Sequence, residues 1–317
     1  MKKKASAVII CLWVLVILTM LAVGIGHRVS MALRLSRYQR DKLIASYLAK
    51  AGVERAIFEI TNDTTANLIN SKWASNKDVF EKIMVGANSQ GFATVSYVMN
   101  DGFREETIFG VVDEERKINL NTAPCGLLEK LLDYVNADNP VDLAKYICGW
   151  RGDAGVTVPD AEYESLGYKN KGKPFTNIQE LKLVKGMTLE IYKSLENLVT
   201  VHSSGKINLN TASPQILEIV TNYIISLTTS PTPNLSALAE TTLKLRTDKI
   251  IFDSTFTDQL GLISADEASV VNNANLLDVK STCFFITSNG KIEKNGFTQT
   301  LSVIYNRTGE IVYRYEG

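Results

Sequence analysis

The first 60 residues have a pattern that is typical of one long helix. Residues 5–26 contain no charged side chain and follow three lysines at positions 2–4. About 20 apolar residues suffice for a helix to cross the hydrocarbon core of a bilayer. Residues 27–60 contain no proline, and their apolar side chains recur at helical spacing among basic ones. We therefore expect one helix from about residue 6 to about residue 60, apolar in its first half and amphipathic in its second.

The apolar segment is open to three interpretations. A cleaved secretory signal has a shorter apolar core and a small-residue cleavage site, and only residues 22–24 resemble such a site here. A plain membrane anchor is the second interpretation. The third is the uninterrupted helix of a pilin-type subunit, which accounts for both halves of the pattern. Basic residues lie on both sides of the apolar segment, so they leave its orientation open.

Alternation of apolar and polar residues predicts strands in two distant places. In the first, residues 93–99 alternate, Asn100-Asp101-Gly102 marks a tight turn and a return strand ends near Val112. In the second, residues 283–315 have the same texture, with a turn expected at Asn289-Gly290. A lone hairpin is too small to be stable. We expect an α+β fold in which one antiparallel pilin-like sheet packs on the N-terminal helix and residues 113–277 are inserted as a large all-α domain.

The expected insertion contains an exact internal repeat. The heptapeptide Lys117–Ala123 recurs as Lys206–Ala212, and each copy reads as a short extended piece followed by the start of a helix. Thr122 is a candidate helix cap in the first copy, and Thr211 or Ser213 in the second. We expect the asparagines of the repeat to bond to neighbouring backbone and fix the turn, and not to act in catalysis.

Between the two copies, residues 175–198 predict a helix, a turn centred on Gly186 and a second helix. This pattern resembles a helix-hairpin-helix, a module that grips DNA phosphates through backbone amides. The alternative function is therefore a membrane-tethered DNA-binding protein of the competence type. Two features argue against it: the DNA-binding hairpin usually has Gly-x-Gly, and a minimal DNA receptor has no place for the C-terminal sheet.

The distribution of charge argues further against nucleic acid. The chain has 317 residues with 34 basic and 34 acidic side chains, and 45% of its residues are hydrophobic, which excludes a disordered tail. Residues 1–60 carry ten basic and three acidic side chains, whereas residues 113–277 carry 15 basic and 21 acidic ones. DNA binding needs clustered Lys and Arg to release counterions. The acidic insertion therefore disfavours a nucleic-acid partner.

The N-terminus resembles a type IV prepilin leader, a short basic peptide that is removed just before the apolar helix. The resemblance places the cut between Ala5 and Ser6, although most members have Gly before it. Most pilins have Glu at the fifth mature position, and this chain has Ile10. A carboxylate in the bilayer is costly unless it is paired, and in pilin-like fibres that Glu is thought to pair with the amine of the subunit ahead. A subunit without it suits the leading position.

The whole order of segments resembles minor pseudopilin K of type II secretion systems. The resemblance implies a leader (1–5), a membrane segment (6–26), two halves of a pilin-like part (27–112 and 278–317) and the insertion (113–277). It implies a tip subunit that starts or caps the pseudopilus in protein secretion, held in the bacterial inner membrane with its bulk in the periplasm. The implied partners are minor pseudopilins of the I and J types, the major pseudopilin, prepilin peptidase, the membrane platform, the secretin and cargo. A minor pilin of a type IV pilus is a further alternative.

Few residues suggest a chemical site. Cys125 and Cys148 lie in the first half of the insertion, where they are either disulfide-bonded or two buried thiols. Related insertions can bind calcium, and the candidates here are Asp153, Asp160 and Glu162, although part of the expected carboxylate set is missing or shifted. No Cys/His cluster has zinc spacing, and no nucleophile–base pair or phosphate-binding glycine loop is evident. We therefore do not expect an enzyme.

Overall fold

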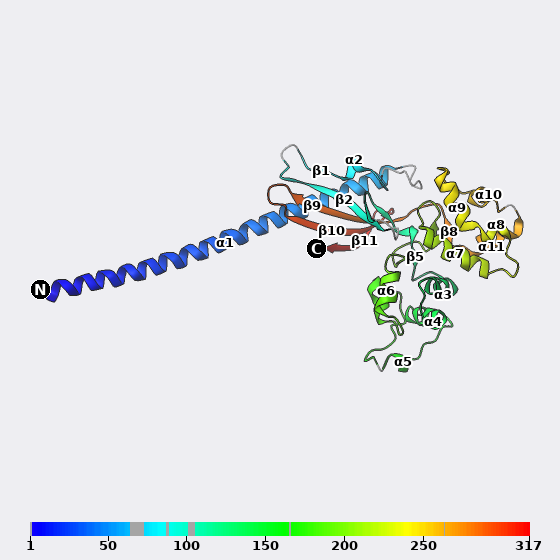
Figure 1. The fold of residues 1–317 in the computed structure, drawn as a ribbon, viewed down its shortest axis with the longest axis horizontal. Coiled ribbons are helices and arrows are strands. Elements are labelled where there is room, and N and C mark those ends of the chain that lie inside the picture. Colours follow the sequence, from blue (N-terminus) through cyan, green and yellow to red (C-terminus); the bar gives the residue numbers. More distant parts are fainter. Residues whose placement is uncertain (1, 64–72, 87–88, 101–104, 165, 263) are drawn as a thin grey trace.

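The computed structural model describes residues 2–63, 73–86, 89–100, 105–164, 166–262 and 264–317, and of residues 2–10 only the backbone. Helix α1 (Lys2–Asn62) is continuous, which confirms the expected long helix. Residues 11–40 of α1 are exposed, and this part projects away from the rest of the molecule (Figure 1). By length and composition α1 can cross a membrane. The remaining part of α1 packs on a sheet.

The sheet joins strands from both ends of the chain, as predicted. It has seven strands in the order β1-β2-β9-β10-β11, with β3 beside β2 and β4 beside β9. All of these pairs are antiparallel. The strands, with a short helix α2 (Lys77–Phe80) before them, are β1 (Ile83–Met84), β2 (Gly91–Asn100), β3 (Glu105–Phe109), β4 (Val112–Asp113), β9 (Cys283–Ile292), β10 (Thr298–Asn306) and β11 (Ile311–Glu316).

The turn expected at Asn289-Gly290 is wrong, because β9 runs through it to Ile292. Gly290 instead lets the helix approach the sheet. A Cβ at Gly290 would clash with the backbone of α1, where the nitrogen of Ala49 lies 2.5 Å from the Cβ position. A glycine in a strand can mark such a close backbone approach as well as a turn. The turn predicted at residues 100–102 lies partly outside the described residues.

The insertion forms two lobes that share one hydrophobic core, which is separate from the core between α1 and the sheet. The first lobe contains β5 (Ile118–Asn119), α3 (Cys125–Tyr134), α4 (Pro140–Trp150), α5 (Ala161–Glu164), η2 (Ile178–Leu183), α6 (Leu189–Leu195) and β6 (Val199–Thr200). The second contains β7 (Ile207–Asn208), α7 (Pro214–Ser226), α8 (Pro233–Ser236), α9 (Leu238–Thr247), α10 (Phe256–Gln259), α11 (Ala265–Ala274) and β8 (Leu277–Asp278).

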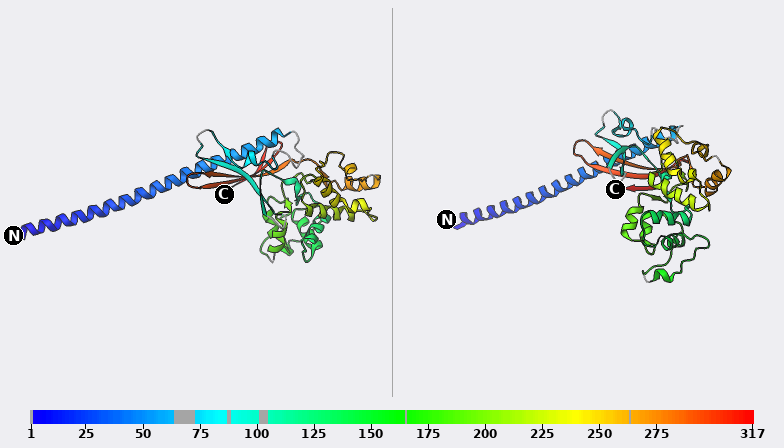
Figure 2. Two further views of the ribbon diagram at one scale, coloured as in Figure 1. Left: turned by 45° about the horizontal axis from the view of Figure 1, so that its top comes forward. Right: turned by 45° about the vertical axis from the view of Figure 1, so that its right-hand side comes forward.

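Each lobe is mostly helical and is closed by a short parallel strand pair, β5 with β6 and β7 with β8. These pairs are an addition to the predicted all-α insertion. Helix α3 packs on α7, so the lobes touch each other. Both lobes lie at the end of the sheet away from the N-terminus (Figures 1 and 2).

Candidate functional site

The two copies of the heptapeptide form the same turn in the two lobes. In the first copy the side-chain oxygen of Asn119 accepts from the backbone N–H of Asn121 at 2.8 Å, and in the second Asn208 accepts from Asn210 at 2.9 Å. Such asparagine turns give the backbone a local partner at the entry to a helix. This agrees with the structural role expected for these residues.

The last asparagine of each copy ties its turn to a distant phenylalanine. The Asn121 amide accepts from the backbone N–H of Phe175 at 2.7 Å and donates to its carbonyl at 2.9 Å. The Asn210 amide makes the same pair of bonds with Phe252, at 2.9 and 3.0 Å. The repetition therefore extends beyond the heptapeptide to whole lobes.

In each lobe an arginine donates a hydrogen bond to the carbonyl of the alanine that ends the heptapeptide. Arg151 Nη2 donates to the Ala123 carbonyl at 2.7 Å, and Arg246 Nη1 donates to the Ala212 carbonyl at 2.6 Å. Arg151 is buried, binds the Asp153 carboxylate through Nε at 2.6 Å and also through Nη2, and so is neutralised within its own lobe. Arg246 has no acidic partner among the described residues.

Ser213 caps α7 by accepting from the N–H of Ile216, as expected for the second copy. In the first copy the helix α3 begins after Pro124, and Thr122 makes no cap bond, so that prediction is wrong. The shared heptapeptide therefore fixes the turn in both lobes, and the residues after it decide how each helix starts.

Two buried acids hold the inserted domain to the sheet. Asp113, at the end of β4, accepts from Asn208 at 3.1 Å, from Thr211 at 2.5 Å and from Ser281 at 2.7 Å. Glu115 accepts from the hydroxyl of Thr282, from the backbone N–H of Cys283 at 3.0 Å and from that of Ser204 at 3.3 Å. These acids connect the second lobe, the segment that precedes it and the start of β9.

Burial dominates the titration of this pair. It raises the pKa of Asp113, although the hydrogen bonds from Thr211 and Ser281 oppose the shift. Burial, and next the charge of Asp113, raise the pKa of Glu115 to about 8. Two adjacent carboxyl groups in one buried site favour retention of a proton. Burial likewise raises the pKa of the neighbouring Cys283 thiol to about 12, so this cysteine is an inert part of the strand.

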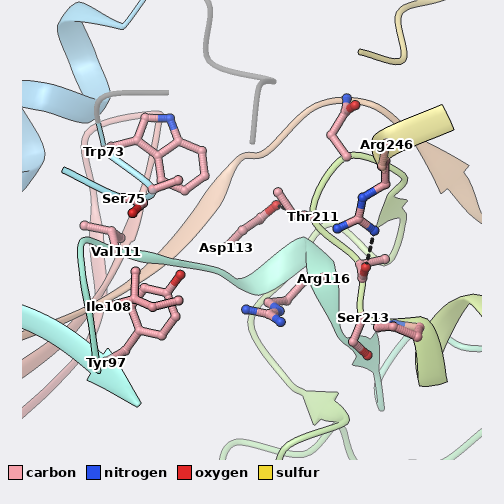
Figure 3. Close-up of a pocket in the computed structure, with 14 residues that line it drawn as sticks. Trp73, Ser75, Tyr97, Ile108, Val111, Asp113, Arg116, Thr211, Ser213 and Arg246 are labelled. Carbon is pink, nitrogen blue, oxygen red and sulfur yellow. Dashed lines mark hydrogen bonds between the residues drawn. The ribbon is translucent and has the colours of Figure 1, made fainter. Parts of the chain in front are cut away.

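A cavity of about 240 Å³ lies between the sheet and the second lobe (Figure 3). Its lining falls into an apolar wall on the sheet side and a polar wall on the lobe side. Of the labelled residues, Trp73, Ser75, Tyr97, Ile108 and Val111 lie on the sheet side, and Thr211, Ser213 and Arg246 belong to the second lobe. Asp113, at the end of β4, and Arg116, just after it, lie between them. A second cleft of about 830 Å³ runs between the sheet and the first lobe, and it shares Tyr97, Arg116 and Ser213 with the cavity.

The predicted cysteine pair lies in the first lobe, where the structure joins Cys125 to Cys148 with Cα atoms 6.2 Å apart. The thiol positions and Asp153 form a compact group. Disulfide sulfur is a poor ligand for calcium, which takes six to eight oxygen ligands.

The three calcium candidates each face a cation of their own. Asp153 binds Arg151, Asp160 lies 3.8 Å from the Lys169 ammonium, and Glu162 pairs with Lys185. In the part of the chain that the structure describes, they form no shared group of acidic ligands. Calcium binding stays a prediction that this arrangement does not favour.

The predicted leader residues Ala5 and Ser6 and the position Ile10 lie in α1, and their side chains are outside the described part. Residues missed by the sequence analysis are the buried acids and the two arginines of the cavity. The run Asp113-Glu114-Glu115-Arg116, placed directly before a heptapeptide copy, was the available signal. Charged residues are normally read as solvated, and here all three acids of the run are almost fully buried.

Residues 111–204 match the family model described as type II secretion system (T2SS), protein K. This range covers the buried acids and the first lobe. The fold is similar to that of GspK in the crystal structure of the GspK–GspI–GspJ complex from the type 2 secretion system of enterotoxigenic Escherichia coli. The TM-score is 0.61 at 17% sequence identity, over 90% of this chain and 99% of that chain. No curated protein sequence matches the chain. The resemblance to a K-type minor pseudopilin is confirmed by these two matches.

Proposed function

We propose that this protein is the minor pseudopilin at the tip of a type II secretion pseudopilus, where it initiates or caps assembly during protein secretion across the outer membrane. The observation that carries the proposal is the position of the two lobes, at the end of the sheet away from the N-terminus (Figure 1). A subunit in the body of a fibre must be surrounded by its neighbours. The lobes widen this end of the molecule, and only the end of the fibre leaves them room.

The N-terminal sequence supports the leading position. Prepilin peptidase would cut between Ala5 and Ser6, and residues 6–26 would hold the subunit in the inner membrane with the rest of the chain in the periplasm. Ile10 would then be the fifth mature residue. It has no carboxylate that needs the amine of a subunit ahead, and an unpaired carboxylate in lipid would be costly.

The partners follow from the relative. GspK of enterotoxigenic Escherichia coli is found with GspI and GspJ, and we extend this to I-type and J-type minor pseudopilins of the present system. The major pseudopilin would follow below the tip. The inner-membrane platform, the secretin and the secreted cargo are further partners of the same proposal.

The competing function, DNA binding, has less support. Lys185, beside Gly186, pairs with Glu162, and Lys171 pairs with Glu180 at 2.5 Å, whereas Lys182 lies over the ring of Tyr192. A phosphate-binding face needs cations that are free to meet phosphate. The detergent-solubilised full chain should therefore not retain duplex DNA in a gel shift at physiological salt, and retention at micromolar protein would favour the competing function.

Mass spectrometry of the protein from membranes tests the proposal directly. We expect a mature N-terminus at Ser6. An intact Met1, or a cut near Gly24, would contradict the prepilin interpretation. The variant Ile10→Glu should enter the body of the fibre or block assembly, because it gains the carboxylate that docks beneath another subunit. Unchanged behaviour at the tip would show that the missing carboxylate does not set its position.

A further inference from the structure

We propose that the cavity of about 240 Å³ between the sheet and the second lobe binds an acidic side chain of a partner protein through Arg116 and Arg246. The proposal goes beyond a place at the tip, because it assigns a binding site and the chemistry of its ligand. In Figure 3 the guanidinium group of Arg246 lies on the second lobe, and that of Arg116, on the segment after β4, lies between Arg246 and Tyr97.

The two arginines lack a counter-charge among the described residues. In the part of the chain that the structure describes, Arg116 makes no hydrogen bond or ion pair, and Arg246 makes only its bond to the Ala212 carbonyl. Both side chains are half-buried. Burial, and the nearby charge of Arg116, lower the pKa of Arg246. Two partly desolvated like charges without an anion are unfavourable, so a bound carboxylate would stabilise the site.

Asp113 lines the same cavity and does not fill this role. Its carboxyl group already receives bonds from Asn208, Thr211 and Ser281, and it forms no ion pair with either arginine. The acid is committed to holding the lobe on the sheet, so the arginines remain available to an external anion.

The first lobe shows which group satisfies an arginine at this position. Arg151 binds the alanine carbonyl of its heptapeptide, as Arg246 does, and its other donors go to the Leu120 carbonyl and to the carboxylate of Asp153. Planar guanidinium groups and carboxylates match in geometry. The second lobe has the same arginine without the acid, and the cavity lies where a carboxylate could reach it.

The helix and the walls favour a carboxylate on a polypeptide. Helix α7, 13 residues long, begins at the cavity with Ser213 and Pro214 in the lining, and the start of a helix favours an anion. Small-molecule sites usually measure about 300–1,000 Å³, so this cavity fits one side chain better than a nucleotide. Trp73, Ile108 and Val111 offer apolar contact to a residue beside the acid.

The adjoining cleft gives such a segment room to continue. It measures about 830 Å³ and meets the cavity at Tyr97, Arg116 and Ser213. Amide side chains that can bond to an extended backbone line it, namely Asn136, Asn197, Gln215 and Asn289. The expected ligand is therefore an extended segment that carries Asp or Glu next to an apolar residue.

Site-specific photocrosslinking in secreting cells tests the site. Ser75 is exposed at the cavity and has no part in the proposed binding, so Ser75→p-benzoylphenylalanine places the crosslinker there. We expect a crosslinked peptide from a partner protein that contains Asp or Glu. Adding Arg116→Met should reduce the crosslink about tenfold, the loss typical of one charge-assisted bond. Lys244→Met, at an exposed position of α9, the helix that carries Arg246, is the control for loss of a positive charge and should change nothing.

A charge exchange completes the test. Arg116→Glu should abolish the crosslink, and replacing the identified partner acid by Arg should restore it. A crosslinked peptide without an acidic residue, no crosslink, or equal effects of Arg116→Met and Lys244→Met would overturn the site. In each case the N-terminus at Ser6 is measured on the same cells. A correct N-terminus with a failed crosslink rejects the cavity alone, and a wrong N-terminus rejects the proposed function.

Discussion

The two lobes share a framework and differ in how they complete it. Both contain the heptapeptide turn. In both, the last asparagine of the heptapeptide bonds to the backbone of a phenylalanine, which we call the asparagine clamp. In both, an arginine donates to the carbonyl of the alanine that ends the heptapeptide. The first lobe adds Asp153 and a disulfide between Cys125 and Cys148. The second has neither and leaves Arg246 beside a cavity. A repeated motif can thus be structural in one copy and available for binding in the other.

The largest difference in stability between the lobes should appear when their arginines are replaced. Arg151→Met leaves two carbonyls and the Asp153 carboxylate without a buried donor, and we expect a loss of about 3 kcal/mol in the stability of the first lobe. Arg246→Met removes one carbonyl bond and also relieves repulsion with Arg116, so its loss should be about 1 kcal/mol or less. Chemical denaturation of the solubilised chain, followed by hydrogen exchange of each lobe, measures both. Equal losses of stability would mean that Arg151 and Arg246 contribute equally to the stability of their lobes.

Part of this arrangement could be predicted from the sequence. The long helix and the split sheet follow from hydrophobic periodicity, and the heptapeptide revealed the repeat. The sequence does not predict that Arg151 and Arg246 occupy equivalent positions. Their spacings from the two heptapeptide copies differ, and only the folded chain brings each arginine to its alanine. The sequence predicts a turn at Gly290, because the close approach of α1 to the sheet at this residue produces no pattern in the neighbouring sequence. The buried acids were missed for the same reason.

Reduction of the disulfide should destabilise the first lobe more than the second. Closing a loop with 23 residues of separation is worth about 3 kcal/mol in the chain-entropy model. We therefore expect Cys125→Ser with Cys148→Ser to lower the stability of the first lobe by about 2–3 kcal/mol. Peptide mapping without a reductant should recover the two cysteines as one linked species. Hydrogen-exchange rates in the second lobe serve as the internal control. Equal acceleration of exchange in both lobes would contradict the expectation that the disulfide acts mainly on the first lobe.

The asparagine clamps should differ with burial. Asn210 is fully buried and Asn121 is half-buried. Asn210→Ala leaves the N–H and carbonyl of Phe252 unsatisfied away from water, and we expect a loss of about 2 kcal/mol. Asn121→Ala allows water to reach Phe175, and its loss should be about half as large. Thermal unfolding of both variants measures the difference. A larger loss of stability for Asn121→Ala would contradict the expectation that the more buried asparagine contributes more.

The buried acids that join the second lobe to the sheet should make stability depend on pH. Glu115 keeps its proton to about pH 8 in the folded chain because of burial and the charge of Asp113, whereas an ordinary glutamate loses it near pH 4.5. Between these values the unfolded chain binds fewer protons than the folded chain, so stability falls as pH rises through this range. Glu115→Gln cannot ionise and should flatten this slope, losing stability at pH 5 and recovering it relative to the parent at pH 8. Glu162→Gln, at an exposed pair of the first lobe, is the control and should leave the slope unchanged. Parallel pH profiles for Glu115→Gln and the parent would show that Glu115 is ionised in the folded protein, and that its donors Thr282, Cys283 and Ser204 outweigh its burial.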